Sequence, residues 1–218
     1  MATSQLKLYN GALVLLGETR LASLSESREP RHILDNIWDN GLVDRCLEEG
    51  LWNFATRTRE ISYNPSISSD FGFQYAFDKA SDFIRTVQVS SDEHFVNSLV
   101  GHQYHDEGEY LWCDLQTIYW RYVSNDSEFG GDLSLWPESF TNFVEHYLAH
   151  RAAPLIGHKQ LDLENGREWP SLTRARRNAR SKDAMGQGTS FPPTGSYVRS
   201  RLGGSRRRDG GRGGQLIG

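Results

Sequence analysis

The chain has 218 residues and a formal net charge of −4 at pH 7, a length that provides one substantial domain, or one domain with a tail. The charge is unevenly distributed, because residues 1–170 hold 26 acidic and 13 basic side chains, a net of −13, whereas residues 171–218 hold two acidic and eleven basic ones, a net of +9. The longest apolar run, residues 12–16, is far too short to cross a bilayer, so the sequence excludes a membrane-spanning helix. The charge division predicts an acidic body whose basic end contacts a negatively charged surface, such as a neighbouring copy or an acidic partner.

Two helices are predicted in the first 50 residues. From Ser4 to Leu16 apolar residues recur at helical spacing, with Ser4 as the N-cap and Gly17 as the C-terminal stop. After a polar connector, Pro30 marks the first turn of a second helix that ends at Gly50. Gly41, in its middle, is expected to weaken this helix without stopping it.

The pattern changes over residues 58–125, where apolar and polar positions alternate, as in residues 85–89 and 117–123. Enrichment in tyrosine, tryptophan and valine accompanies this period of two. The segment is therefore predicted to form antiparallel strands with one solvent-facing side.

Helical periodicity then returns. Pro137 is expected to open a helix over residues 138–153, and a fourth helix is expected over about residues 160–184, kinked or restarted at Pro170. Beyond Met185 the composition becomes Gly, Ser, Pro and Arg with scattered apolar residues. Such a segment cannot build its own core, so we expect it to be disordered or extended in the isolated chain.

These elements predict an α+β fold, mainly a helical bundle of four helices with an inserted antiparallel β-domain and an extended C-terminal arm. The expected divisions are residues 1–57 for the first half of the bundle, 58–135 for the β-rich insertion, 136–185 for the second half of the bundle and 186–218 for the extended basic arm.

Catalytic motifs are absent from the sequence. It contains no nucleophile elbow, phosphate-binding loop or dinucleotide fingerprint, and Cys46 and Cys113 lie in no recognisable nucleophile context, so we expect neither an enzyme nor a cofactor. The two cysteines are far apart and no apolar leader opens the chain. These features predict a soluble protein made in a reducing cytoplasm.

Two histidine pairs are candidate metal ligands. His102 and His105, with Asp106 beside them, offer nitrogen and oxygen ligands, but a polar turn between two strands explains the same residues. His146 and His150 share a helix face, yet no glutamate directly follows the first of them, so two boundary side chains are the simpler interpretation. A metal-dependent hydrolase at the first pair stays an alternative that elemental analysis would test.

The basic side chains near the end of the chain form two groups. Arg174, Arg176, Arg177 and Arg180 fall in the expected fourth helix, where their spacing predicts a solvated face beside the acidic body. The arm carries the second group: Arg199, Arg201, Arg206, Arg207, Arg208 and Arg212. Their composition leaves two functions open, a nucleic-acid-binding tail rich in arginine and glycine, and an arm that docks on an acidic protein surface.

Residues 9–61 resemble the opening of a known family. An aliphatic helix ends in Leu-Gly-Glu at residues 16–18, a serine- and leucine-containing connector and a long helix follow, and Trp-x-Phe-Ala occupies residues 52–55. Residues 75–89 resemble a later segment in which an aromatic strand, a turn and an arginine-valine strand follow one another. In order and spacing, over roughly residues 5–160, the chain is similar to the bacteriophage head-to-tail adaptor (connector) proteins of the tail tubular protein A-like type.

The resemblance implies a structural protein without a catalytic step or cofactor, assembled as a ring, usually dodecameric, beneath the portal at the head-tail junction of the virion. The implied partners are the portal protein, neighbouring copies of the chain, a downstream tail or nozzle protein, and genomic DNA that passes through the lumen without specific binding; no membrane is involved. The C-terminal arm would reach onto portal subunits. The predicted portal-binding residues are Phe191, Tyr197, Val198, Arg199, Arg201, Leu202, Arg206, Arg207, Arg208 and Arg212.

A ring of this kind needs side faces that recognise each other head to tail. The large aromatic residues of the β-insertion exceed what a small, half-solvated sheet needs for its own core, so some are expected to face neighbouring copies. The predicted subunit-interface residues are Phe71, Phe73, Trp112 and Trp120. The acidic body suits a channel, because carboxylates repel the DNA backbone and let it pass.

Overall fold

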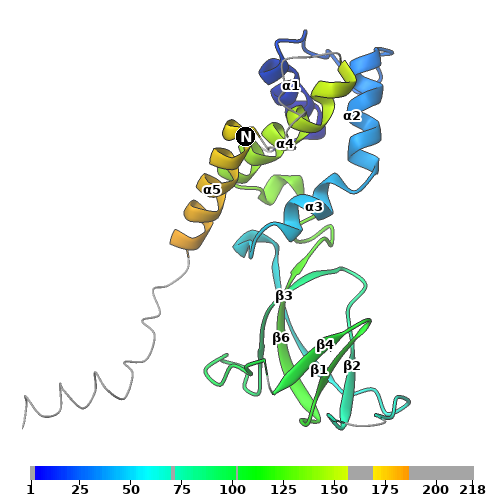
Figure 1. Ribbon diagram of the computed structural model, residues 1–218, viewed down its shortest axis with the longest axis vertical. Helices are drawn as coiled ribbons and strands as arrows, with labels where there is room; N and C mark the ends of the chain where they lie inside the picture. Colours follow the sequence, from blue (N-terminus) through cyan, green and yellow to red (C-terminus); the bar gives the residue numbers. More distant parts are fainter. Residues whose placement is uncertain (1–2, 70–71, 102, 157–168, 187–218) are drawn as a thin grey trace, which may run out of the picture. The chain divides into compact units, whose positions relative to one another are not determined.

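The computed structural model describes residues 3–69, 72–101, 103–156 and 169–186, all within one compact unit, residues 1–186. This part of the chain contains five α-helices and two three-stranded antiparallel sheets, so the predicted α+β class is confirmed. In Figure 1 most of the helices gather in the upper half of the view and the strands in the lower half. None of the described helices combines the length and the apolar character needed to cross a bilayer.

Helix α1, Gln5–Leu16, has the two ends that its sequence predicts. Ser4 is extended, with φ −133°, and its Oγ accepts a hydrogen bond from the Lys7 amide at 3.3 Å. Gly17 adopts φ 75°, which lets the following N–H reach the Leu13 carbonyl at 2.8 Å. Because left-handed backbone favours glycine, the helix stops where the sequence predicts.

The second predicted helix is wrong as a single element, because the chain interrupts it at Gly41. Helix α2 spans Glu29–Asp39, with Pro30 in its first turn as predicted, and helix α3 spans Leu42–Glu48. Gly41 lies between them with φ 77°, a left-handed conformation that no α-helix contains. The bend gives each short helix its own direction, so that both can bury apolar side chains.

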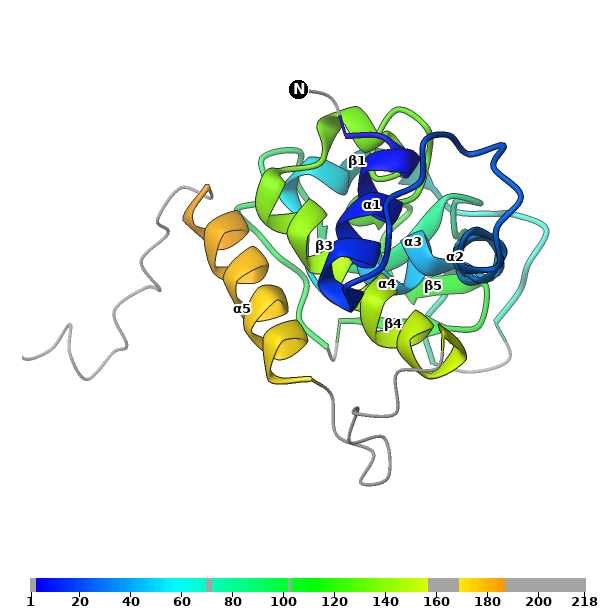
Figure 2. The same cartoon turned by 90° about the horizontal axis from the view of Figure 1, so that it is seen from above.

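Helix α4, Glu138–Ile156, continues three residues past its predicted end and includes Pro154. Helix α5, Pro170–Met185, begins at the proline where the sequence allowed a restart, and residues 160–168 of the predicted helix lie outside the described residues. Helices α1, α2 and α5 each pack against α4. Figure 2 shows α1 near the centre of the view and α5 apart from it at the left, so α4 is the element that these helices share.

The centre of the helical core is aromatic. The Trp52 ring lies 4.8 Å from the ring of Phe140 and 6.3 Å from that of Phe143, measured between centroids. Its indole N–H donates to the Cys46 carbonyl at 3.1 Å. Trp52 belongs to the Trp-x-Phe-Ala motif, and Trp52 and Ala55 are both fully buried, so this motif joins the helices to the first strand by packing.

The six strands form two sheets. Sheet A has the order β1–β6–β3, with β1 at Thr56–Ser62, β6 at Thr117–Ser124 and β3 at Phe83–Ser90. Sheet B has the order β2–β5–β4, with β2 at Tyr75–Asp78, β5 at Tyr110–Cys113 and β4 at Tyr104–Glu107. Their inner faces share one apolar cluster, to which sheet B contributes Phe77 and Leu111 and sheet A contributes Val89 and Ile118.

Trp120 also belongs to this cluster and is not available to a neighbouring subunit. Its side chain is fully buried, stacks on Tyr122 at 4.2 Å and donates its indole N–H to Thr86 Oγ1 at 3.3 Å. The prediction that Trp120 forms a subunit interface is therefore wrong. The physical reason is that two sheets share a core, which needs more large side chains than the single sheet assumed from the sequence.

A polar network joins the strands of sheet A at the end where β1 begins and β6 ends. Asp82, just before β3, accepts hydrogen bonds from Arg57 Nη1 at 2.9 Å, from the Tyr122 hydroxyl at 3.1 Å and from Ser124 Oγ at 2.5 Å. The Arg57 guanidinium also lies over the Phe129 ring, 5.0 Å from its centroid. Asp82 thus connects the ends of β1, β3 and β6.

Candidate subunit interface

The outer face of sheet B carries a row of aromatic side chains. In β5, Leu111 and Cys113 are buried in the shared core, so the alternation of the strand places Tyr110 and Trp112 on the other face. Register brings His105 of β4 opposite Trp112. The rings of Tyr110 and Trp112 are 6.2 Å apart and nearly perpendicular.

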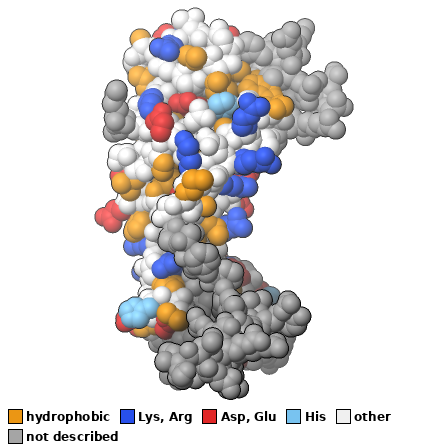
Figure 3. Space-filling view, turned by 90° about the vertical axis from the view of Figure 1, so that its left-hand side faces the viewer, with side chains coloured by type: hydrophobic (Ala, Val, Ile, Leu, Met, Phe, Trp, Pro, Cys, Tyr) orange, Lys and Arg blue, Asp and Glu red, His pale blue; other side chains and the backbone are white. Residues whose placement is uncertain are grey.

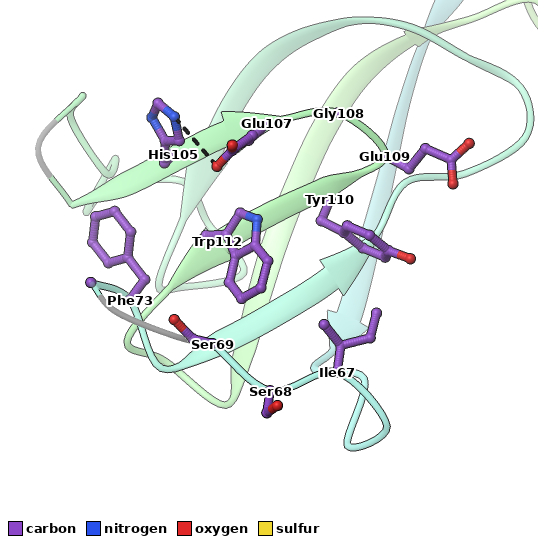
Figure 4. Close-up of a pocket in the computed structure, with 11 residues that line it drawn as sticks. Ile67, Ser68, Ser69, Phe73, His105, Glu107, Gly108, Glu109, Tyr110 and Trp112 are labelled. Atoms are coloured by element: carbon purple, nitrogen blue, oxygen red, sulfur yellow. Dashed lines mark ion pairs between the residues drawn. The ribbon is translucent and has the colours of Figure 1, made fainter.

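The segment between β1 and β2 turns this face into a groove. Ile67, Ser68, Ser69 and Phe73 line the groove together with the side chains of β4 and β5, and the cavity measures about 830 Å³. Figure 4 shows Trp112 and Tyr110 extending from β5 towards the loop that carries Ile67, Ser68 and Ser69, with Phe73 below His105.

Hydrogen bonds hold both ends of that segment against the sheet. The Asn64 amide N–H donates to the Ala76 carbonyl at 2.7 Å, and Asn64 Nδ2 donates to Asp78 Oδ2 at 2.9 Å. At the other end, the Gln74 N–H donates to Asp114 Oδ1 at 3.0 Å. Both described ends of the segment are therefore attached to sheet B within the single chain.

The chemistry of the groove suits a protein segment with apolar and basic side chains. Aromatic and aliphatic carbons form its floor, while Glu107, Glu109 and His105 contribute polar groups at its edge. His105 Nε2 lies 3.9 Å from Glu107 Oε2, the ion pair drawn in Figure 4. An apolar floor with a charged rim is the usual composition of a protein contact.

The predicted interface residues thus have different positions. Phe73 and Trp112 are half-buried and line the same groove, Trp120 lies in the core, and Phe71 lies outside the described residues. The sequence singled out these two aromatic residues as interface candidates, a prediction that stays open, and it gave no sign of the loop that brings them together.

The first candidate metal site is divided by the strand. His105 lies on the groove side of β4, whereas Asp106 binds Lys79 Nζ and lies 3.4 Å from Thr86 Oγ1, and His102 lies outside the described residues. Within the described ranges, no three His, Cys, Asp or Glu side chains come together as a metal site would require.

The second histidine pair faces helix α5. His146 donates its Nδ1–H to the Asn142 carbonyl at 2.9 Å, and the His150 ring lies edge-on to Trp169 at 5.3 Å. Both histidines are half-buried, as predicted for boundary positions.

The arginines of α5 do not form the single solvated face that their spacing predicted. Arg176 and Arg180 bind Glu49 at the end of α3, at 3.3 and 2.7 Å, and so attach α5 to the rest of the helices. Arg174 and Arg177 instead line a cavity of about 540 Å³ between α4 and α5. Figure 3, which views the side of the molecule on the left of Figure 1, shows Lys and Arg side chains gathered on it.

All ten predicted portal-binding residues, from Phe191 to Arg212, lie outside the described residues. Both cysteines are buried and free, and burial raises the pKa of the Cys46 thiol far above its usual value. A buried, protonated thiol is a poor nucleophile.

Comparison with known proteins adds no relative to this picture. No protein-family model matches the chain, and no curated protein matches its sequence.

Proposed function

We propose that this chain is a structural head-to-tail adaptor of a bacteriophage virion. In this proposal copies of the chain form a ring, a dodecamer, beneath the portal, extend the channel for the genomic DNA and provide the platform for a tail or nozzle protein. The protein would be made in the host cytoplasm and reside at the head-tail junction, without catalysis or a cofactor. Its helices, with α2 and α3 counted together, would form the four-helix bundle of that family.

The observation that carries the proposal is the aromatic groove on sheet B. A β-module inserted between helices is the arrangement that the family resemblance implies, and the groove gives that module a surface suited to a neighbouring copy. Phe73 and Trp112 keep part of their surface exposed there, beside the carboxylates of Glu107 and Glu109. Half-exposed aromatic side chains in a formed pocket are the usual anchors of a protein contact.

The portal contact is assigned to the C-terminal arm on the basis of its sequence. Its arginines complement acidic surfaces, and its scattered apolar residues, such as Phe191 and Leu202, suit grooves on another chain. An arm that orders only on binding would delay ring closure until a portal ring presents its site.

Electron microscopy of the purified protein mixed with a candidate portal protein tests the ring. Rings stacked on portal are expected for the full chain, and for a chain without residues 190–218 we expect a folded monomer that no longer binds portal. Full binding by the shortened chain would exclude the arm as the contact. Retardation of duplex DNA by the full chain at physiological salt, without portal binding, would instead favour a nucleic-acid-binding tail.

Trp112→Ala tests the groove. We expect it to raise the protein concentration needed for ring formation by at least about tenfold while the thermal transition of the monomer stays cooperative. Val96→Ala is the matched control, because Val96 is 79% exposed on the β-module but lies outside the groove. Equal ring formation by both variants would exclude the groove as an interface.

A further inference from the structure

Hydrogen-bond donors gather in the cavity between α4 and α5. The α5 side chains that line it include Ser171, Arg174, Arg177, Asn178 and Ser181, and the α4 side chains are those of Asn142 and His146. Every one of these side chains can donate a hydrogen bond. None of the described lining residues is acidic, and Ala175, the apolar residue among them, is small. The cavity therefore offers donors and positive charge to a ligand.

The two arginines of this cavity are unpaired among the described residues. Arg174 and Arg177 are exposed, and neither takes part in an ion pair or a hydrogen bond there. On the same helix, by contrast, Arg176 and Arg180 both bind Glu49. Side chains three positions apart on a helix are neighbours, so the like charges of Arg174 and Arg177 repel each other. An anion held between the two guanidinium groups would relieve that repulsion.

The carboxylates closest to the cavity in sequence are directed elsewhere. Glu145, which directly precedes His146, lies on the α1 side of α4, so near Gly11 that a side chain at position 11 would overlap its carboxyl group. On α5, the carboxylate of Asp183 accepts a hydrogen bond from the Asn53 N–H at 3.1 Å. The described part of the chain therefore leaves the positive charge of the cavity available to a ligand.

The donors suit a phosphate-type oxyanion. A guanidinium group presents two parallel N–H groups that match two oxygens of a phosphate. The Nδ1 atom of His146 is occupied by the Asn142 carbonyl at 2.9 Å, so the protonated ring has its Nε2–H left for a further acceptor. Ser171 lies in the first turn of α5, the end at which the helix dipole favours negative charge.

The described lining does not suit larger ligands. It contains no aromatic side chain on which a nucleic-acid base could stack, and no large apolar side chain that could anchor a protein segment. In this respect the cavity differs from the aromatic groove on sheet B. Its chemistry selects a small and strongly polar anion.

We propose that the cavity between α4 and α5 binds one small phosphate-type oxyanion, inorganic phosphate or a phosphomonoester, through Arg174 and Arg177. His146 and the serine hydroxyls contribute further donors. This site goes beyond the proposed ring function and does not depend on it, because a single chain supplies all of these residues.

Calorimetric titration of the full chain with inorganic phosphate, at constant ionic strength, tests the site. We expect one ion to bind per chain with a Kd of about 1 mM or below. Arg174→Gln with Arg177→Gln should weaken binding at least about tenfold, because both forks are lost. Lys182→Gln is the matched control, since Lys182 is an exposed cation of the same helix outside the lining, and it should leave the affinity unchanged. The arginines beyond residue 186 are the same in all three proteins, so the difference between them reports the cavity.

A second measurement needs no arginine variant. The ring-proton NMR signal of His146, assigned with His146→Asn, should shift as phosphate saturates the unaltered chain. A signal that stays in place while phosphate binds would locate the ion elsewhere and overturn the site. Titration with glycerol phosphate separates the two sources, because tighter binding than that of inorganic phosphate supports a phosphomonoester and weaker binding supports the free ion.

Three other results would overturn the site. The first is equal phosphate affinity of the double variant and the unaltered chain. The second is an equal loss of affinity in Lys182→Gln, which would indicate diffuse attraction to the basic end of the chain. The third is binding of duplex DNA through these two arginines without binding of phosphate. Absence of rings from the unaltered chain would overturn the proposed function and leave this site intact.

Discussion

Replacement of Asp82 by asparagine should strongly destabilise the described unit. The Asp82 side chain is 11% exposed and accepts hydrogen bonds from Arg57, Tyr122 and Ser124, while the Arg57 side chain is 28% exposed. Hydrogen bonds to a charged group contribute about 1.5–3 kcal/mol each, and removing one member of a buried pair costs about 3–5 kcal/mol. Asparagine keeps one acceptor but loses the charge, so we expect a loss of about 3 kcal/mol in the free energy of unfolding at pH 7.

The same substitution should change how stability depends on pH. Burial is the largest single influence on Asp82 and raises its pKa, but the hydrogen bonds from Ser124, Arg57 and Tyr122 together outweigh it and leave the pKa below its usual value. In the unfolded chain an aspartate has a pKa of about 3.9. The native state therefore gains stability from ionised Asp82 above that pH, and loses this gain as the pH falls towards the lower native pKa.

Urea unfolding followed by tryptophan fluorescence measures both effects. The stability difference between the two proteins should be full at pH 7 and shrink in acid below about pH 4. Asp39→Asn, at the exposed end of α2, is the control and should change stability by less than about 0.5 kcal/mol. An Asp82→Asn variant within 0.5 kcal/mol of the original at pH 7, or a difference that is the same at every pH, would refute the reasoning.

Three further substitutions have expected outcomes in thermal unfolding. Glu145→Gln should leave the melting temperature of the monomer unchanged or raise it by a few degrees, because the amide removes a half-buried charge; a clear decrease would contradict the assigned burial. Gly130→Ala should cost about 2 kcal/mol or more, since its Cβ would meet the Ser124 carbonyl, whereas Gly101→Ala has open space and should be neutral; similar effects at both positions would contradict the packing. Gly41→Ala should cost about 1 kcal/mol because of the left-handed backbone, and a gain in stability would instead indicate a continuous helix.

The sequence predicts an element best where the deciding interaction is local. Ser4 begins α1 and Gly17 ends it through hydrogen bonds to residues a few positions away, so all the partners lie within one short stretch of sequence. Gly41 is different, because glycine is compatible with a weakened helix and with a left-handed break. The choice depends on where α2 and α3 find apolar partners, which a local pattern does not contain.

At the candidate site too, the sequence predicts what depends on local pattern and misses what depends on distant parts of the chain. An excess of aromatic residues in the β-rich segment drew attention to Phe73 and Trp112, which line one groove, but alternation alone could not separate them from the buried Trp120. That separation depends on which face of each strand the second sheet covers. The half-buried carboxylate of Glu145 gave no sequence signal, since its environment is created by Gly11, a residue 134 positions earlier.

The placement of the α5 arginines limits what this helix can bind. The charge division of the sequence suggests a basic end wholly available to a partner, yet Glu49 already neutralises part of it through Arg176 and Arg180. Only a small number of cations remain directed outward from α5. A nucleic acid is held by many phosphate contacts, and its binding strength grows with their number. The exposed cations left on α5 are by themselves a small surface for phosphates, which argues against a nucleic-acid surface confined to this helix.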